Sequence, residues 1–285
     1  MKVLSEARIA VVGLGLMGGS LAGALRGRCR QVVGVARRRQ TLEVALAAGL
    51  IGEGTTSLAD GVRNADVVIL ATPVRTILQQ IDEMAPFLPS DCLVMDLGST
   101  KRAVLAAMER LPPHVQPLGG HPMCGKEKSG LEAADPDLYW NCTFILVPLP
   151  RTSPEALALG REIVRAVGAR PLVLDAERHD RWVAFLSHLP YALSWALVAA
   201  AEEVLTADPT AREVAAAGFR DTSRLAASDV TMMVDILLTN REMVLHALRA
   251  CRNHLDRLAE WLEQGDEGAL RIALTSVRRQ RLEMF

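Results

Sequence analysis

Between Ile9 and Leu174, short apolar runs rich in β-branched residues alternate with segments whose apolar residues recur at helical spacing. Near-continuous apolar strands separated by helical segments are typical of a parallel sheet that helices cover on both faces. Residues 1–173 are therefore predicted to form a doubly wound α/β domain. The predicted strands are IAVVGLG (9–15), QVVGVA (31–36), DVVILAT (66–72), CLVMDL (92–97), TFILVP (143–148) and RPLVLD (170–175).

After Asp175 the strand pattern stops, and residues 174–285 are predicted to form an all-helical domain. Apolar residues recur every three or four positions over 232–262, which predicts one long amphipathic helix. Its apolar stripe could close over a substrate, mediate dimerisation or do both; alternatively, it only builds the core of the domain. The stripe contains Met233, Ile236, Leu237, Val244, Ala247, Leu248, Cys251, Leu255, Leu258 and Leu262.

The longest apolar stretch, from Trp182 to Val204, is interrupted by His188 and Pro190. It is shorter in uninterrupted length than a membrane-spanning helix requires, so it is expected to be a buried helix and not a membrane span. The first residues, MKVLSEARIAVVGLG, carry an acid and an arginine before a short apolar run that ends in glycines, so no secretory signal is expected there.

Composition narrows the classes of partner. The chain has 285 residues, 50% of them hydrophobic, which suffices for two domains with real cores. Its net charge of −1 gives no reason to expect binding to nucleic acid or to an acidic membrane surface, so a small-molecule substrate or a protein partner is expected. The five cysteines are odd in number and lack metal-ligand spacing, which favours reduced thiols in a cytoplasmic protein without a metal site.

The first strand runs into Gly13-x-Gly15-x-x-Gly18 and then into a helix. In a dinucleotide-binding domain the first glycine permits the tight turn, the second lets the backbone approach the pyrophosphate, and the third lets helix and strand pack closely. The N-terminus of the helix, at Leu16 and Met17, then presents free N–H groups to the phosphates. The sequence therefore predicts a Rossmann-type dinucleotide site, the alternative being an ordinary glycine-rich turn.

The second strand ends at Ala36, where an NAD-binding domain usually carries an acid for the ribose hydroxyl groups. Arg37, Arg38 and Arg39 follow instead, and a guanidinium can bind a 2′-phosphate with two hydrogen bonds. NADP is therefore favoured as the cofactor, and NAD remains possible. Alternatively, the arginines are the solvated start of a helix.

Polar and small residues also follow two later strands: Thr72 and Pro73 after DVVILAT, and Gly98 and Ser99 after CLVMDL. Ligands bind at the carboxyl ends of the strands in such sheets, so these positions are candidates for cofactor and substrate contacts. They could equally be plain turns in which Ser or Thr begins a helix.

The stretch GGHPMCGKEKSG (119–130) places His121 between two glycines and a proline. Glycine and proline disfavour regular structure, so a shaped loop is predicted. Neutral imidazole can accept a proton from a hydroxyl group, so His121 is either a catalytic base near the nicotinamide or a solvated loop residue.

Five motifs together resemble the prephenate/arogenate dehydrogenase family of tyrosine biosynthesis. They are GLGLMGGSLAGALR, DLGSTK, GGHPMCGKEKSG, SHLPYAL and GFRDTSR, in this order over essentially the whole chain. The resemblance implies a dinucleotide-binding domain, a helical domain that forms a homodimer, and an active site between them. It also implies oxidative decarboxylation of prephenate to 4-hydroxyphenylpyruvate, with hydride transfer to NAD(P)⁺.

The resemblance implies roles for particular residues. His121 matches the catalytic histidine, Ser99 a serine near the reacting hydroxyl, and Arg224 the arginine that binds a substrate carboxylate. Glu127 and Asp221 match acids near that arginine; alternatively, they are surface charges.

His188 in SHLP is expected to contact substrate or nicotinamide, with a structural core histidine as the alternative. No role is assigned to His179, and His114, His246 and His254 are expected to be structural or solvated.

Tyr191 stands where some relatives that use prephenate carry a histidine that could contact the substrate side chain. A phenol donates a hydrogen bond but is not cationic near pH 7. Prephenate is favoured as the substrate, with arogenate or both as alternatives. Two other readings stay open: a different NADP-linked reductase of the same two-domain plan, and a protein that binds NADP without turnover.

Overall fold

The computed structural model describes residues 2–126 and 128–284. Eight strands form a single sheet in the order β3-β2-β1-β4-β5-β6-β7-β8. Every neighbouring pair is parallel except β6 and β7, which are antiparallel. The predicted doubly wound sheet is confirmed. Its strands are β1 (Arg8–Val12), β2 (Gln31–Val35), β3 (Glu53–Thr55), β4 (Val67–Leu70), β5 (Leu93–Asp96), β6 (Gln116–Pro122), β7 (Thr143–Pro148) and β8 (Arg170–Val173).

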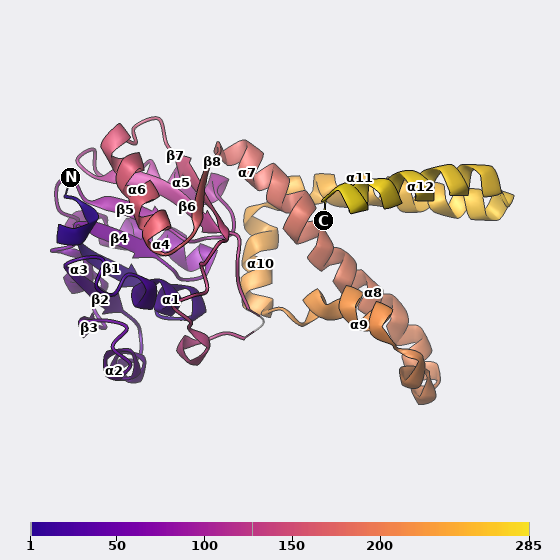
Figure 1. Cartoon of the computed structure of the whole chain (residues 1–285), viewed down its shortest axis with the longest axis horizontal. Helices are drawn as coiled ribbons and strands as arrows, with labels where there is room; N and C mark the ends of the chain where they lie inside the picture. Colours follow the sequence, from indigo (N-terminus) through magenta and orange to yellow (C-terminus); the bar gives the residue numbers. More distant parts are fainter. Residues whose placement is uncertain (1, 127, 285) are drawn as a thin grey trace. The chain divides into compact units, whose positions relative to one another are not determined.

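Helices cover both faces of this sheet (Figure 1). The central strands are buried on both sides, and all of Val67–Leu70 in β4 is inaccessible to solvent. This is why they consist of unbroken apolar runs. One face packs on α1 (Leu16–Ala24), α2 (Arg39–Ala47) and α6 (Pro154–Ala166), and the other on α3 (Leu58–Val62), α4 (Val74–Met84) and α5 (Arg102–Met108).

The segment that carries His121 is not the loop that its glycines and proline predicted. Strand β6 continues through Pro122, with His121 opposite Ile145 of β7. The glycines permit close packing: a Cβ on Gly120 would lie 2.4 Å from the backbone oxygen of Asp96. Pro122 is tolerated because β6 no longer pairs with β5 beyond Leu118, so the missing N–H breaks no second ladder.

After β8 the described chain is helical, and it passes through SHLP without a break. Helix α7 (Ala176–Val183) continues through a π-helical turn (η4, Ala184–His188) into α8 (Leu189–Ala207). The π turn accommodates Pro190, so the helix continues where His188 and Pro190 interrupt the apolar stretch. All of α8 is described, and Ser194 is the one residue of this helix that is buried. The prediction of a buried helix is therefore wrong for the single chain.

By length and composition alone, Ala176–Ala207 could cross a membrane, although the core helix of a soluble protein passes the same test. Within the described residues it is the one helix of this kind, and 22% of its most apolar window is buried. The expected absence of a membrane span stays a prediction.

The long helix predicted over 232–262 is two helices. Helix α10 (Val230–Thr239) ends at Asn240, and α11 (Arg241–Gln264) begins after it. Asn240 leaves helical geometry, with φ −117° and ψ 28°, and its amide donates to the backbone oxygen of Asp180 at 2.8 Å. A long-range hydrogen bond thus ends a helix that the local pattern would continue.

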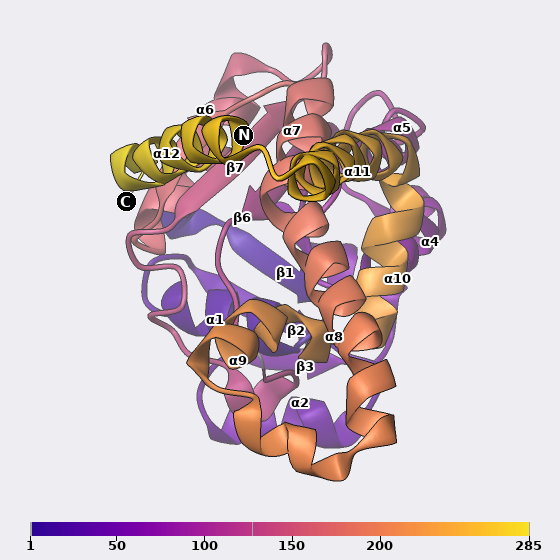
Figure 2. The same cartoon turned by 90° about the vertical axis from the view of Figure 1, so that its right-hand side faces the viewer.

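The chain forms two compact units, one ending at Arg241 and the other beginning at Glu242. In the first, α10 packs on α4, and α9 (Ala217–Ser223) lies beside α8 (Figure 2). The second consists of α11 and α12 (Glu267–Met284). The division at residues 173 and 174 stays a prediction. The short turns are η1 (Leu4–Glu6), η2 (Ala85–Phe87), η3 (Leu131–Ala133), η5 (Pro209–Val214) and η6 (Arg224–Ala227).

Candidate active site

The turn after β1 has the geometry of a dinucleotide cradle. Gly13 has φ +98°, which favours glycine, and its N–H donates to the oxygen of Val35 at 2.8 Å. A Cβ on Gly18 would lie 1.8 Å from the oxygen of Gly13, so helix and turn could not pack with any other residue there. A Cβ on Gly15 would meet nothing within 4 Å, which leaves the backbone open to a phosphate. These residues fit a bound dinucleotide.

The other predicted cofactor residues lie around this turn or at the same edge of the sheet. Leu16 and Met17 open α1, and Met17 accepts a hydrogen bond from the Tyr139 hydroxyl at 2.7 Å. Arg37 and Arg38 follow β2 as exposed side chains, after the half-buried Ala36. Their contacts with a cofactor stay predictions.

The carboxyl ends of β1, β4, β5 and β6 meet at one edge, because these strands are mutually parallel. Thr72 follows β4, and its hydroxyl donates to Gln80 at 2.7 Å, while Pro73 caps α4. Gly98 and the half-buried Ser99 follow β5. His121, near the end of β6, therefore lies at the sheet edge where such folds bind ligands.

A buried ion pair joins the turn after β5 to the strand that carries His121. The Asp96 carboxylate accepts hydrogen bonds from the backbone N–H groups of Gly98 at 2.7 Å and Gly120 at 3.1 Å. It also pairs with the Lys101 ammonium, which in turn donates to the oxygen of Gly120 at 2.7 Å. Both charged side chains are fully buried. Burial lowers the pKa of Lys101, and the Asp96 charge opposes that shift.

His121 is the first member of a buried chain of side chains. Its Nδ1 lies 2.8 Å from Nε2 of His179, and the two rings meet edge to face at 63°. Nδ1 of His179 lies 2.7 Å from an oxygen of Asp180. Since all three side chains are buried, these hydrogen bonds are shielded from water.

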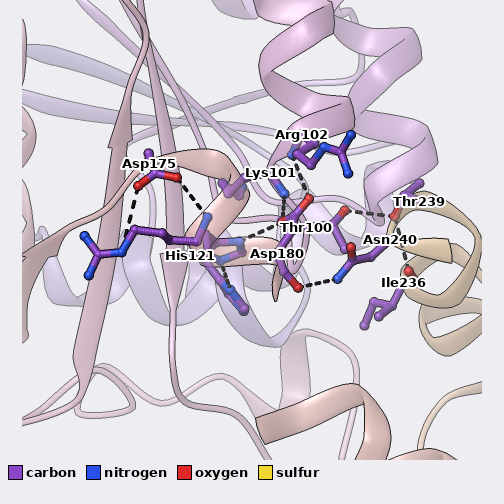
Figure 3. A network of polar contacts seen from close by, with 12 residues as sticks. Thr100, Lys101, Arg102, His121, Asp175, Asp180, Ile236, Thr239 and Asn240 are labelled. Atoms are coloured by element: carbon purple, nitrogen blue, oxygen red, sulfur yellow. Dashed lines mark hydrogen bonds and ion pairs between the residues drawn. The ribbon is translucent and has the colours of Figure 1, made fainter. Parts of the chain in front are cut away.

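Asp180 also fixes the start of α5. Its two carboxylate oxygens accept the backbone N–H groups of Lys101 at 2.7 Å and Arg102 at 2.9 Å (Figure 3). Burial raises the pKa of Asp180, but the hydrogen bonds from His179 and from these N–H groups outweigh it, and the net pKa is lowered. The Asn240 amide lies 3.3 Å from Nδ1 of the buried His188, which connects this network to the π turn.

Burial keeps the three clustered histidines neutral. It is the largest cause of the lowered pKa of His121, followed by the electrostatic effects of His179, Lys101 and His188, which disfavour a second positive charge here. Burial likewise lowers the pKa of His188 to about 4 and lowers the pKa of His179 against the effect of Asp180. A neutral imidazole retains the lone pair that a general base needs near pH 7.

Tyr191, Asp221 and Arg224, which are expected to bind substrate, lie on helical segments after β8. Tyr191 is half-buried on α8, and Arg224 is an exposed residue at the start of η6. Asp221 is exposed and pairs with Arg220 at 3.7 Å. Glu127 lies outside the described residues. The predicted roles of these side chains, and those of Ser99 and His188, stay predictions.

Four buried residues of the site received no role from the sequence: Asp96, Lys101, His179 and Asp180. Asp96 and Lys101 both lie within DLGSTK. A lysine that directly follows an apolar strand and its turn could have indicated a buried ion pair. His179 lies 58 residues from its partner His121, so no local pattern indicates their contact. Among the residues that the structure describes, no group of three or more His, Cys, Asp or Glu could hold a metal ion.

Comparisons with known proteins identify the family of the chain. The family model for the prephenate dehydrogenase nucleotide-binding domain matches residues 21–173, and the one for the prephenate dehydrogenase dimerization domain matches residues 175–276. A prephenate dehydrogenase of Bacillus subtilis is 33% identical over 262 residues, which cover 90% of this chain and 71% of the relative.

Two solved structures share the whole fold. A prephenate dehydrogenase from A. aeolicus, in complex with hydroxyphenyl propionate and NAD⁺, is 33% identical, with a TM-score of 0.90 and full coverage of both chains. The arogenate dehydrogenase of Synechocystis is 31% identical, with a TM-score of 0.85 over 98% of this chain and 100% of its own. With the glycine cradle, these likenesses support a nicotinamide cofactor. The chain belongs to the prephenate dehydrogenase family of nicotinamide-dependent oxidoreductases.

Proposed function

We propose that this enzyme converts prephenate to 4-hydroxyphenylpyruvate and carbon dioxide, with NADP⁺ preferred over NAD⁺. The observation that carries the proposal is His121: a buried, neutral imidazole at the same sheet edge as the glycine cradle. A bound nicotinamide supplies the hydride acceptor. The residues of the chain then have to remove one proton and hold the substrate.

In this proposal His121 receives the proton of the ring hydroxyl as hydride leaves the same carbon, and carbon dioxide departs as the ring becomes aromatic. Ser99 hydrogen-bonds near the reacting hydroxyl. Arg224 binds a substrate carboxylate, which a guanidinium can grip with two hydrogen bonds. His188 and Tyr191 contact the substrate from the π turn and α8, and Asp221 orients Arg224.

A homodimer through the helical residues is part of the proposal. The exposed fractions of Trp195 (62%) and Val204 (60%) on α8 leave large apolar side chains in contact with solvent in the single chain. Covering such a face with a second copy would remove it from water.

The direct test mixes purified protein with prephenate or arogenate and with NADP⁺ or NAD⁺, and follows the absorbance of the reduced cofactor. Turnover of prephenate with a higher kcat/KM than that of arogenate is expected. Faster turnover of arogenate would reassign the substrate, and no reduction of either cofactor by either substrate would reject the activity.

Replacing Arg37 and Arg38 together with alanine is expected to weaken NADP⁺ binding about tenfold or more, because charge-assisted hydrogen bonds to the 2′-phosphate are lost. NAD⁺ lacks that phosphate, so its affinity should change less than about twofold. Fluorescence titration of both cofactors measures the difference. Arg28→Ala, an exposed arginine before β2, is the matched control. Equal weakening of both cofactors would assign Arg37 and Arg38 to the solvated surface.

A further inference from the structure

The contact between His121 and His179 restricts where hydrogen atoms can lie. Two ring nitrogens face each other at 2.8 Å, so a hydrogen bond between them contains one hydrogen, donated by one ring to the other. If His121 donates from Nδ1, its Nε2 keeps a free lone pair that can accept a proton from a substrate. If His179 donates instead, the hydrogen of His121 lies on Nε2, and its one lone pair, on Nδ1, is occupied by His179.

Asp180, the last of the three side chains in this hydrogen-bonded series, determines which ring donates. Both carboxylate oxygens of Asp180 accept backbone N–H groups, from Lys101 at 2.7 Å and from Arg102 at 2.9 Å, which is the arrangement of an ionised carboxylate, and an ionised carboxylate only accepts hydrogen bonds. Its oxygen lies 2.7 Å from Nδ1 of His179, so that nitrogen carries the hydrogen. Neutral His179 then has a bare Nε2, which can only accept. The hydrogen between the rings therefore belongs to Nδ1 of His121.

We infer that His179, oriented by Asp180, is a positioning residue that holds His121 in the Nδ1–H tautomer and leaves its Nε2 free to accept the substrate proton. Free imidazole does not impose this tautomer, so the enzyme must impose it. The role in turnover rests on the proposed function, whereas the tautomer does not.

The same chain can accommodate the proton after transfer. When Nε2 of His121 accepts a proton, the Nδ1 hydrogen can move to Nε2 of His179, and His121 is neutral again. The positive charge then lies on His179, beside the Asp180 carboxylate at 2.7 Å. This transfer of the proton uses only His121 and His179. Lys101 takes no part in it, because its ammonium is already bonded to Asp96 and to the oxygen of Gly120.

Two variants of His179 separate this role from simple packing. His179→Leu removes the acceptor that faces His121, whereas His179→Gln has similar volume and can offer an amide oxygen in its place. Asp180 is unsuitable for the test, because its carboxylate also binds the N–H groups of Lys101 and Arg102.

We expect His179→Leu to lower kcat between about tenfold and a hundredfold, less than the full contribution of a general base, with KM changed less than about threefold. His179→Gln should recover most of the lost kcat. Wild-type turnover in His179→Leu, or equal losses in both variants, would overturn the inference.

The tautomer is measured independently of activity by two-bond ¹⁵N–¹H correlation spectra of protein labelled at its six histidines, with His121 assigned from the His121→Asn variant. The wild type should show Nδ1–H at His121, and His179→Leu should shift it toward Nε2–H. An Nε2–H form in the wild type would overturn the inference. If the wild type turned over neither prephenate nor arogenate, the proposed function would fail, and this spectrum would still decide the tautomer.

Discussion

The His121→Asn variant is expected to bind cofactor as the wild type does and to lose about 10²–10⁴-fold in kcat, the usual contribution of a general base. An amide has no nitrogen that accepts a proton near pH 7, so the hydroxyl proton would have to pass to water. The amide N–H can still donate toward Nε2 of His179, which preserves the packing of the site. Steady-state kinetics with prephenate, together with fluorescence titration of the cofactor, measures the two effects.

The matched control is His114→Asn. His114 is exposed, and its ring makes one long contact, 3.4 Å from the backbone oxygen of Leu88. The same substitution there should leave kcat within about twofold of the wild type, because no reacting group is involved. Near wild-type turnover in His121→Asn would mean that another group is the base.

The sheet could be predicted from sequence because its strands obey a local rule. A strand buried on both faces, such as Val67–Leu70, has to be apolar at every position, and that pattern is visible without knowledge of its neighbours. The glycine cradle was predictable for a similar reason. The positive φ of Gly13 and the close approach at Gly18 restrict the residue type directly.

The strand at His121 could not be predicted, because its cause is tertiary. Glycine and proline are poor strand formers by local preference, and GGHP contains three such residues. In the fold, Gly120 lies against the backbone of Asp96, where no side chain fits, and β7 supplies the partner for the ladder. The neighbouring strands decide this segment.

The polar network around Asp180 could not be predicted from the sequence for the same reason. Asp180 meets Lys101 across 79 residues of sequence, and Asn240 meets Asp180 across 60. Each contact exists only once the sheet and the helices have assembled. The helix break at Asn240 depends on one of these contacts, so periodicity predicted one helix where the structure has two.

The Lys101→Met variant is expected to lower the free energy of unfolding by about 3–5 kcal/mol, the second large effect that the structure predicts. Methionine has similar length but no charge, so the Asp96 carboxylate would remain buried with only the N–H groups of Gly98 and Gly120 as partners. Urea denaturation at fixed protein concentration measures the change, since any dimer would make stability depend on concentration.

The matched control is an ion pair that is exposed to solvent, because the loss of one partner there should affect the free energy of unfolding much less than in the buried Asp96–Lys101 pair. Arg110 and Asp82 form an ion pair at 2.8 Å, with side chains 56% and 57% exposed, so Arg110→Met should leave the free energy of unfolding close to that of the wild type. Adding Asp96→Asn to Lys101→Met should recover part of the loss, because an uncharged amide is less costly to bury than an unpaired carboxylate. If Lys101→Met unfolded at the same urea concentration as Arg110→Met, the Asp96–Lys101 pair would contribute no more to stability than a surface ion pair. The link that this pair makes between the turn after β5 and the strand of His121 would then not be what holds His121 in place.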